Sequence, residues 1–383
     1  MKPLVDQVLL DRLSEWRQAL HAQAELSGQE VKTARLVTDI LKDLQPDALV
    51  EGLGGHGVMA VFRGKGEGPR LLFRAELDAL PIEEINEVPY RSRQSGVSHK
   101  CGHDGHMAIL LGLAAQLAEQ SLRRGSVYLL FQPAEEDGSG AMAVLEDENF
   151  PPVSFDYVFA LHNLPGYPLG SVVVRQGAFT AAVRSLVIKL KGKTAHAAEP
   201  ENGINPAPAI AELLLAAQQL ERVDPQDPDF GLITPVYLTL GERAYGVAAG
   251  YGEVHVTLRS WTPEGMQKLS AALLEAVEKG CATHRLDREI SWTNTFFANF
   301  NAPEAVSIIA GAAAFNQFPL IEREMPLKWG EDFGAFTQRY KGAMFGLGAG
   351  THTAALHNPD YDFPDQLIEH GAKMLGAICK ALL

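Results

Sequence analysis

The side chains best suited to chemistry gather in a few short segments, and the densest is CGHDGH at residues 101–106. Cysteine, histidine and carboxylate side chains are the ligands that Zn and related metals such as Mn, Co and Ni take in proteins. For Cys101 alone, a buried thiol beside a helix-capping Asp104 is the simpler interpretation. Because His103 and His106 accompany Cys101, the segment favours metal binding.

Two adjacent glutamates, Glu135 and Glu136, follow the apolar segment 126–132. With Asp137 they form three consecutive acids, which most often make a solvated turn. The apolar segment indicates a buried strand, however, so the carboxylates should lie at the end of a sheet, where two anions need a cation. One carboxylate would then bind metal and the other would accept a proton from water, and the residues alone allow either assignment.

Three further histidines are candidates. His162 ends an apolar segment, and His357 lies in AALHNP with His352 nearby as a competitor. A lone histidine after a strand is more often a hydrogen-bonded core residue than a ligand, so His162 and His357 become candidates because other ligand-rich loops share their position. His196 lies in KTAHAAEP, where a surface histidine and a donor to the substrate both fit the spacing. Together these segments predict a metal-dependent hydrolase.

Such a site requires a scaffold that brings distant loops together, and the first half of the chain predicts one. Residues 5–45 repeat their apolar positions at helical spacing. Strands then alternate with helices, with strands at 58–62, 70–77, 126–132 and 157–163 and helices at 106–120 and 138–148. This alternation predicts an α/β domain with a mixed, largely parallel sheet. Open α/β sheets place their sites at the carboxyl ends of strands, where the candidate ligands fall.

The pattern changes near residue 178. Alternating strands and helices follow in the order strand 185–192, helix 206–222, strands 235–241 and 252–261, helix 263–283 and strand 288–296. This βαββαβ order predicts a ferredoxin-like α+β unit with a four-stranded antiparallel sheet and two helices on one face. Since candidate ligands occur on both sides of it, we expect a discontinuous metal-binding domain, 1–178 and 297–383, with 179–296 inserted.

Composition narrows the function further. The 383 residues suit two domains, and the net charge of −14 argues against a nucleic-acid partner. No apolar run reaches membrane-spanning length, and the N-terminus lacks the core of a signal peptide. The sparse cysteines, Cys101, Cys281 and Cys379, fit a reducing compartment, so we expect a cytoplasmic protein.

The chain resembles the amidohydrolase branch of the di-metal aminoacylase/carboxypeptidase family, which includes hippurate hydrolases, indole-acetyl-amino-acid hydrolases and N-acetyl-diaminopimelate deacetylases. The matching segments run in the family's order and cover essentially the whole chain. They are RQALHAQAELSGQE (17–30), RAELDALPIEE (74–84), SHKCGHDGHMAILLG (98–112), FQPAEED (131–137), LHNLP (161–165), KGKTAHAAEP (191–200), GEDFGAF (330–336) and LHNPDYDFPDQLI (356–368).

The resemblance implies a role for each candidate. The ligands of two divalent ions (Mn, Zn, Co or Ni) would be Cys101, His103, Glu136, His162 and His357. Glu135 matches the general base, and His196 matches a lid-domain histidine that reaches the active site of a neighbouring subunit. The inserted unit would then be a lid that also forms a homodimer.

The resemblance is incomplete at several positions. Glu76 stands where the family usually has Asp, Ala24 where it has Pro, and Asn205 where Asp is common. In the inserted unit, Gly246 and Ala249 stand where Asn and Pro are usual. We therefore expect intact metal chemistry and altered contacts between lid and substrate.

The expected function is hydrolysis of the amide bond of an N-acyl amino acid or a related small amide, by a metal-activated water with Glu135 as general base. A dipeptidase or carboxypeptidase on the same fold is the alternative, because the metal motifs fit both. The rival from another class is a non-catalytic metal-binding scaffold. Such a scaffold should have lost Glu135 or a ligand, and this chain has all of them.

Overall fold

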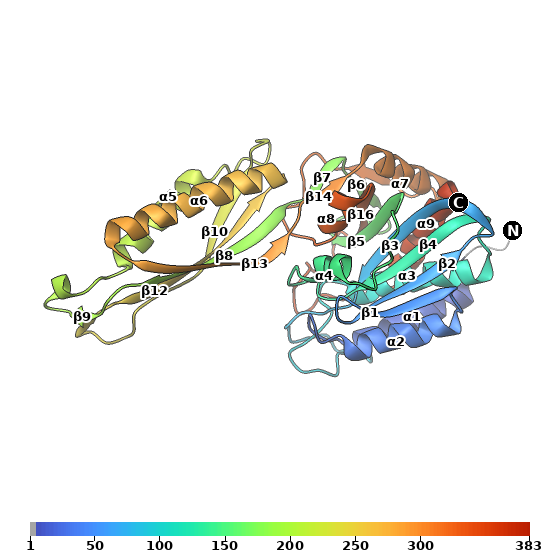
Figure 1. Cartoon of the computed structure of the whole chain (residues 1–383). Helices are drawn as coiled ribbons and strands as arrows, with labels where there is room; N and C mark the ends of the chain where they lie inside the picture. The colour runs from blue at the N-terminus through green and yellow to red at the C-terminus, as the bar shows by residue number, and fades with distance from the viewer. Residues whose placement is uncertain (1–4) are drawn as a thin grey trace. The chain divides into compact units, whose positions relative to one another are not determined.

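The computed structural model describes residues 5–383, and the chain divides into two compact units (Figure 1). The first comprises residues up to Phe179 together with Asn299–Glu324 and Asp332–Leu383; the second comprises Thr180–Ala298 and Met325–Glu331. Positions 1–4 of the predicted first domain lie outside the described residues. Residues 325–331, which the sequence places in the first domain, group with the second unit because Leu327 pairs with Thr180 there.

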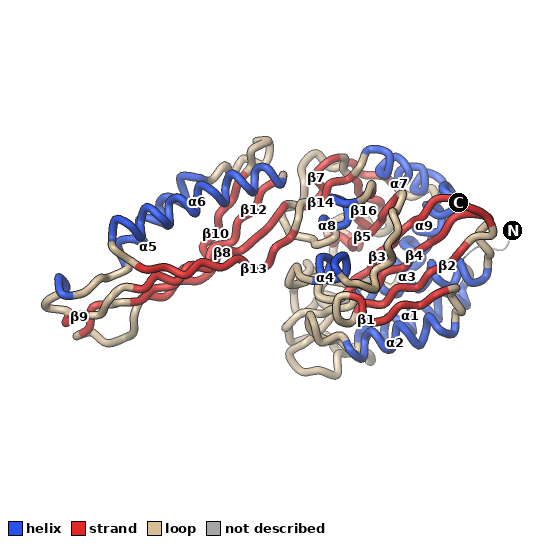
Figure 2. The backbone as a smooth tube through the Cα atoms, in the orientation of Figure 1, coloured by secondary structure: helices blue, strands red, loops and turns tan. Residues whose placement is uncertain are grey.

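The first unit is built on a mixed eight-stranded sheet with the order β1-β2-β4-β3-β5-β16-β6-β15 (Figure 2). Its strands are β1 (Ala48–Leu53), β2 (Gly57–Arg63), β3 (Gly66–Glu76), β4 (Arg124–Gln132), β5 (Tyr157–Pro165), β6 (Val172–Val174), β15 (Leu320–Glu322) and β16 (Gly342–Gly350). The central strands β4, β3, β5 and β16 are parallel neighbours, whereas β1–β2, β2–β4 and β16–β6 pair antiparallel. The predicted α/β domain with a large, mostly parallel sheet is confirmed.

Helices cover both faces of this sheet. They are α1 (Gln7–His21), α2 (Val31–Asp43), α3 (His103–Glu119), α4 (Gly140–Glu146), α7 (Pro303–Phe315), α8 (Gly334–Arg339) and α9 (Gln366–Leu382). Alternate strand residues such as Phe73, Leu129 and Phe159 share one core with α1, α2, α3, α7 and α9, while α4 and α8 lie on the other face (Figure 1). Helix α3 is buried from His103 to Leu117, as expected of a central helix. Within residues 5–383, no helix has the length and apolarity needed to cross a bilayer.

Residues 5–45, which the sequence predicts as helical, form two helices, because the irregular segment 22–30 separates α1 from α2. Helix α1 ends at His21 with Ala22 as its C-cap, and Gly28, inside the segment that follows, has a φ of 74° in the left-handed region that glycine favours. The carboxylate of Glu25 then accepts the N–H groups of Lys32 and Thr33 at 2.9 and 2.8 Å and satisfies two donors in the first turn of α2. Hydrophobic periodicity predicts the helices on both sides, but these side-chain bonds decide where the break falls.

The second unit contains a four-stranded antiparallel sheet with the order β10-β12-β8-β13. Its elements are β8 (Ala182–Lys191), α5 (Ala207–Leu220), β10 (Gly231–Leu240), β12 (Tyr251–Ser260), α6 (Pro263–His284) and β13 (Asp287–Phe296). Both helices share one core with residues of the sheet such as Leu186 and Val254. A separate ribbon pairs β9 (Ala195–His196) with β11 (Val247–Ala248). A further short pair, β7 (Gly177–Thr180) and β14 (Asn299–Asn301), flanks this unit in sequence.

Candidate metal centre

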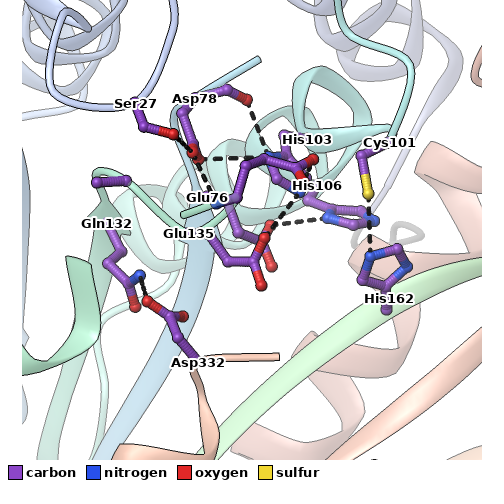
Figure 3. A network of polar contacts seen from close by, with 12 residues as sticks. Ser27, Glu76, Asp78, Cys101, His103, His106, Gln132, Glu135, His162 and Asp332 are labelled. Carbon is purple, nitrogen blue, oxygen red and sulfur yellow. Dashed lines mark hydrogen bonds and ion pairs between the residues drawn. The ribbon is translucent and has the colours of Figure 1, made fainter. Parts of the chain in front are cut away.

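The carboxyl ends of the parallel strands meet at one edge of the first sheet, and polar residues extend from it (Figure 3). Asp78 follows the end of β3, and the turn 133–138, which follows β4, carries Glu135 and Glu136. His162 lies within β5, close to its end, so the strand continues past the predicted boundary at residue 163. Strand ends that are far apart in sequence thereby supply one site, as expected for this class of sheet.

The segment 101–106 forms the start of α3, which begins at His103, three residues before the predicted position. Gly102 precedes it with a φ of 96°, so His103 occupies the first turn of a helix and not an extended loop. His106, one turn further, lies on the same side of the helix. This start buries both imidazoles beneath the carboxyl edge of the sheet.

Cys101, His103 and His162 form the buried side of the centre. Their ligand atoms all lie within 4.8 Å of one another, and the Cys101 Sγ is 3.5 Å from the His162 Nε2. His103 Nδ1 donates to the carbonyl oxygen of Asp78 at 2.9 Å, which fixes its tautomer and turns Nε2 toward the other ligands. Among residues 5–383, no hydrogen-bond partner reaches this buried Nε2, as expected of a metal-binding atom.

Glu136 joins this side to His357. One oxygen of Glu136 lies 3.8 Å from the Nε2 of His103, and the other lies 3.8 Å from the Nε2 of His357. Glu135 is close as well, with an oxygen 3.9 Å from the same atom of His103. The structure therefore brings together all five residues predicted as ligands, as well as Glu135, and selects His357 over His352.

The electrostatics of the cluster fit a divalent cation. Burial, followed by the charges of Glu136 and Glu135, raises the pKa of the Cys101 thiol well above its ordinary value. Burial lowers the pKa of His103, but Glu76 and Asp78 outweigh it and raise that pKa to about 10. Without a cation, the negative charge therefore favours the protonated forms of Cys101 and His103, whereas burial lowers the pKa of His162 to about 3 and also lowers the pKa of His357. A divalent ion supplies that positive charge and allows thiolate and neutral imidazole to form.

His106 is a neighbour of the ligands with a complete set of hydrogen bonds. Its Nδ1 donates to Glu76 at 2.7 Å, and its Nε2 accepts the backbone N–H of Asn163 at 3.1 Å. Glu76, which stands where the resembling family has Asp, also pairs with Arg74 and is fully buried. We interpret His106 and Glu76 as supports that hold α3 against β3 and β5.

A buried ionic network lies between α1 and the start of α3. His21 contacts Asp104 through Nδ1 at 2.8 Å and Glu84 through Nε2 at 3.1 Å. Arg17 bonds to Asp104 at 3.3 Å, and Lys100 donates to Glu84 at 2.8 Å. The network fixes Lys100 and Asp104, the residues next to the candidate ligands Cys101 and His103. The alternative role considered for Asp104, a helix cap, is replaced by this ion pairing.

His196 is placed in the second unit and is exposed. It pairs with Val247 in the β9–β11 ribbon, and the Ala197 N–H donates to the Gly246 carbonyl at 2.9 Å. The Nδ1 of His196 accepts the Ala198 N–H at 3.1 Å, which leaves Nε2 as the protonated nitrogen. The ribbon thus joins His196 to the segment in which Gly246 and Ala249 replace Asn and Pro.

Sequence reasoning missed the residues that orient the ligands. Asp78 holds His103 through its carbonyl and accepts the Glu136 N–H through its carboxylate at 2.9 Å. Asn163 holds His106, and Glu30 bonds to the turn before Glu135. Asp78, Asn163 and Glu30 all lie inside the segments that carry the family resemblance, and this position was the signal that could have identified them. Their spacing in the sequence, however, does not indicate which residue each one bonds to.

Comparison with known proteins identifies the class of this centre. Residues 72–381 match the model of Peptidase family M20/M25/M40. The chain is 35% identical over 382 residues to a probable hydrolase of Synechocystis sp., covering 96% of this chain and 95% of that protein. It is 32% identical to a hippurate hydrolase of Campylobacter jejuni over 93% of this chain and 92% of that one.

A solved structure agrees with these relatives. The YXEP protein of Bacillus subtilis, described as a dinuclear metal binding peptidase from the M20 family, matches with a TM-score of 0.83 and 26% identity over 98% of both chains. The chain therefore belongs to Peptidase family M20/M25/M40 and is a metal-dependent hydrolase. The predicted family relationship is confirmed.

Proposed function

We propose that this protein hydrolyses the amide bond of N-acyl amino acids with two divalent metal ions. The observation that carries the proposal is the position of Glu135 beside the five-ligand cluster. A structural metal site needs no additional carboxylate, whereas hydrolysis needs a base. Hippurate, the substrate in the name of one relative, is itself an N-acyl amino acid.

The proposed roles follow from the contacts. The ions would be held by the side chains of Cys101, His103, Glu136, His162 and His357. Divalent ions bound there would lower the pKa of a water molecule and polarise the substrate carbonyl. Glu135 takes a proton from the attacking water and passes it to the leaving amine, because it lies at the cluster while Glu136 faces two histidines.

The second unit is proposed as a ferredoxin-like lid and dimerisation domain, with the domain limits predicted above. Its edge strand β10 exposes Val236, Leu238 and Leu240, and an apolar strand edge of this kind is usually covered in the native assembly. A second copy would bury it. His196, protonated on Nε2, would then donate to the oxyanion in the neighbouring subunit's site.

The departures in the lid separate into two kinds. Asn205 accepts the Ala207 N–H at 2.9 Å at the start of α5, a bond that an Asp would make equally well. Gly246 and Ala249 flank β11 beside His196 and offer the substrate no polar side chain. We therefore propose that this protein recognises the substrate carboxylate differently from family members that have Asn and Pro at these two positions.

A dipeptidase or carboxypeptidase is the second candidate, and the B. subtilis neighbour described as a peptidase favours it. Both reactions use the same water chemistry and differ in the acyl group accepted.

The proposed ligands include both hard oxygen donors and a soft thiolate, a set that suits Mn or Zn, with Co and Ni as further candidates. The three cysteines are free and buried, which supports a cytoplasmic location.

The test is a substrate panel on the purified protein after metal analysis, comparing N-acyl amino acids with dipeptides. We expect N-acyl amino acids to be hydrolysed faster, and a chelator to abolish the activity reversibly. Glu135→Gln should reduce kcat by on the order of 100-fold or more while metal content stays near wild type, because an amide cannot accept the proton.

Four outcomes would contradict parts of the proposal. Preference for dipeptides would select the peptidase. Loss of metal in Glu135→Gln would mean that the roles of Glu135 and Glu136 are exchanged. An active variant, or a wild-type protein that binds metal but cleaves nothing in the panel, would overturn the proposed reaction.

A further inference from the structure

The irregular segment 22–30 between α1 and α2 contains a buried carboxylate that no step of the proposed reaction uses. Glu30 is fully buried, and its Oε1 accepts two backbone N–H groups, from Gly28 at 2.8 Å and from Ala134 at 2.8 Å. The second bond spans 104 positions and joins this segment to the turn after β4. A buried carboxylate that bonds to a turn so far away in sequence requires an explanation.

The turn that Glu30 contacts has an unfavourable backbone. Ala134 has a φ of 51°, in the left-handed region that a residue with a Cβ rarely adopts. Ala134 immediately precedes Glu135, so its conformation sets the direction in which that side chain leaves the backbone. The Ala134 carbonyl also accepts the Gly140 N–H at 2.9 Å, so the bond to Glu30 holds the N–H side of this residue. Loss of that acceptor removes one of these two restraints and lets Ala134 move toward an ordinary conformation, and Glu135 with it.

Glu136 has a different anchor. Its N–H donates to Asp78 Oδ2 at 2.9 Å, and the same oxygen accepts the hydroxyl of Ser27 at 2.8 Å (Figure 3). The two neighbouring glutamates are thus held through separate backbone groups. The bond from Glu30 acts on the residue before Glu135, and the bond from Asp78 acts on Glu136 itself.

We propose that Glu30 is a positioning residue that holds Glu135 in place for proton transfer through the N–H of Ala134. The inference rests on the proposed role of Glu135 as general base. Removing the acceptor should displace the base while the metal ligand Glu136 keeps its own anchor. A shift of about 1 Å in a reacting group can cost on the order of 100-fold in rate.

The neutral amide should replace this carboxylate. Glu30→Gln keeps a side-chain oxygen of the same reach that can accept both N–H groups. Burial raises the pKa of Glu30, so a neutral side chain suits the environment. Glu30→Asp retracts the oxygen by one methylene and should break the bond to Ala134 without emptying the site.

The experiment compares Glu30→Ala, Glu30→Asp and Glu30→Gln for kcat, KM, metal content and hydrogen exchange of a peptide covering 133–138. Glu30→Ala and Glu30→Asp should lower kcat by about 10- to 100-fold with unchanged KM and metal content. Exchange in the turn should accelerate by about tenfold, because the Ala134 N–H has lost its acceptor. Glu30→Gln should restore most of the kcat and the slow exchange.

Glu25→Ala is the matched control, because Glu25 is a buried carboxylate of the same segment that bonds to α2 instead of the turn. It should lower stability and speed exchange at the start of α2 while keeping the kcat of wild type. The proposal is overturned if Glu30→Ala keeps its kcat, if it loses metal together with kcat, or if Glu25→Ala reduces kcat equally.

Failure of the proposed reaction would look different. It would appear in wild type as absent turnover, or as an active Glu135→Gln variant, whatever substitution stands at Glu30. If Glu30→Ala does not fold, Glu30→Asp decides the question, since an unchanged kcat and unchanged exchange in that variant also overturn the proposal.

Discussion

Single residues in unusual backbone conformations shape this metal centre. Gly102, Ala134 and His357 have φ values of 96°, 51° and 65°, and each lies at or beside a proposed ligand or base. His357 is held in place by its N–H, which donates to the Lys100 carbonyl at 2.8 Å. Such conformations persist only where surrounding contacts enforce them, and they gather at functional sites.

At Gly102 the space is as restricted as the backbone. A Cβ there would lie 2.3 Å from Asn163 Nδ2 and 3.0 Å from the Tyr361 hydroxyl. We therefore predict that Gly102→Ala displaces Cys101 and His103, weakens metal binding at least tenfold and destabilises the fold by about 1–3 kcal/mol. Metal titration and thermal unfolding of the variant measure the two effects.

Gly96→Ala separates backbone strain from this clash. Gly96 has a φ of 75°, but a Cβ there meets nothing within 4 Å. Gly96→Ala should therefore lower the stability modestly, through backbone strain alone, and leave the metal affinity unchanged. If Gly102→Ala binds metal as tightly as wild type, the close approach of Gly102 to Asn163 does not determine the positions of Cys101 and His103.

At the scale of elements, the ionic network joins α1 to α3, because Arg17 and His21 of α1 both bond to Asp104 of α3. It thereby holds the start of α3, which carries the candidate ligand His103. His21 of α1 is fully buried against Asp104 of α3 and against Glu84. Burial alone lowers the pKa of His21, but Asp104 and Glu84 outweigh it and raise that pKa from 6.5 to about 9. The folded protein therefore favours the protonated form of His21.

This contact predicts a pH dependence of stability. Because the folded pKa lies above the ordinary one, the stabilisation from His21 is complete below pH 6.5 and is lost as the pH rises toward 9. His21→Gln removes the titration but retains hydrogen bonding. The difference in thermal midpoint between wild type and the variant, measured on metal-saturated protein, should therefore narrow across this window.

The other groups beside His21 titrate outside this pH window in wild type. Asp104 and Glu84 are its ion-pair partners, Tyr90 and His99 have ring centres 5.5 and 6.1 Å away, and Arg17 shares Asp104. In wild type the pKa of Glu84 is lowered to about 2 and that of His99 to about 3, the pKa of Asp104 is, against the effect of burial, lowered by His21 and Arg17, and the pKa of Tyr90 is raised by burial. His21 is therefore the group of this network that titrates between pH 6.5 and 9. A midpoint difference that stays constant from pH 6.5 to 9 would contradict a protonated His21 in the folded protein.

At the level of the whole molecule, the proposed dimer makes each active site depend on two chains. In an isologous dimer, Glu135 of one chain and His196 of the other would form each composite site. His196→Ala and Glu135→Ala homodimers should then both be nearly inactive. Refolded together, they should recover up to roughly a quarter of wild-type activity, because statistical mixing gives half heterodimers with one intact site each.

Size-exclusion chromatography and tagged-chain capture verify that mixed dimers have formed. Heterodimers without activity would place His196 in its own chain's site or outside the reaction. A monomeric wild-type protein that is fully active would contradict the dimer altogether. A Leu238→Lys variant tests the proposed interface, since a charge on the β10 edge should oppose pairing without affecting Glu135.

The sequence by itself determined the family, the alternation of strands and helices, and the residues that could bind metal. These follow from local composition and from segments such as CGHDGH and the paired Glu135 and Glu136, whose chemistry can be read without coordinates.

The tertiary structure decided which of those residues meet and what holds them. Periodicity marks residues 5–45 as helical without a break, whereas the irregular segment 22–30 exists in the structure, where Glu25 and Glu30 bond to groups outside any repeating pattern. Asp78 and Glu30 act on residues 25 to 104 positions away. Contacts over such separations depend on how strands are ordered in the sheet, and hydrophobic periodicity carries no information about that order.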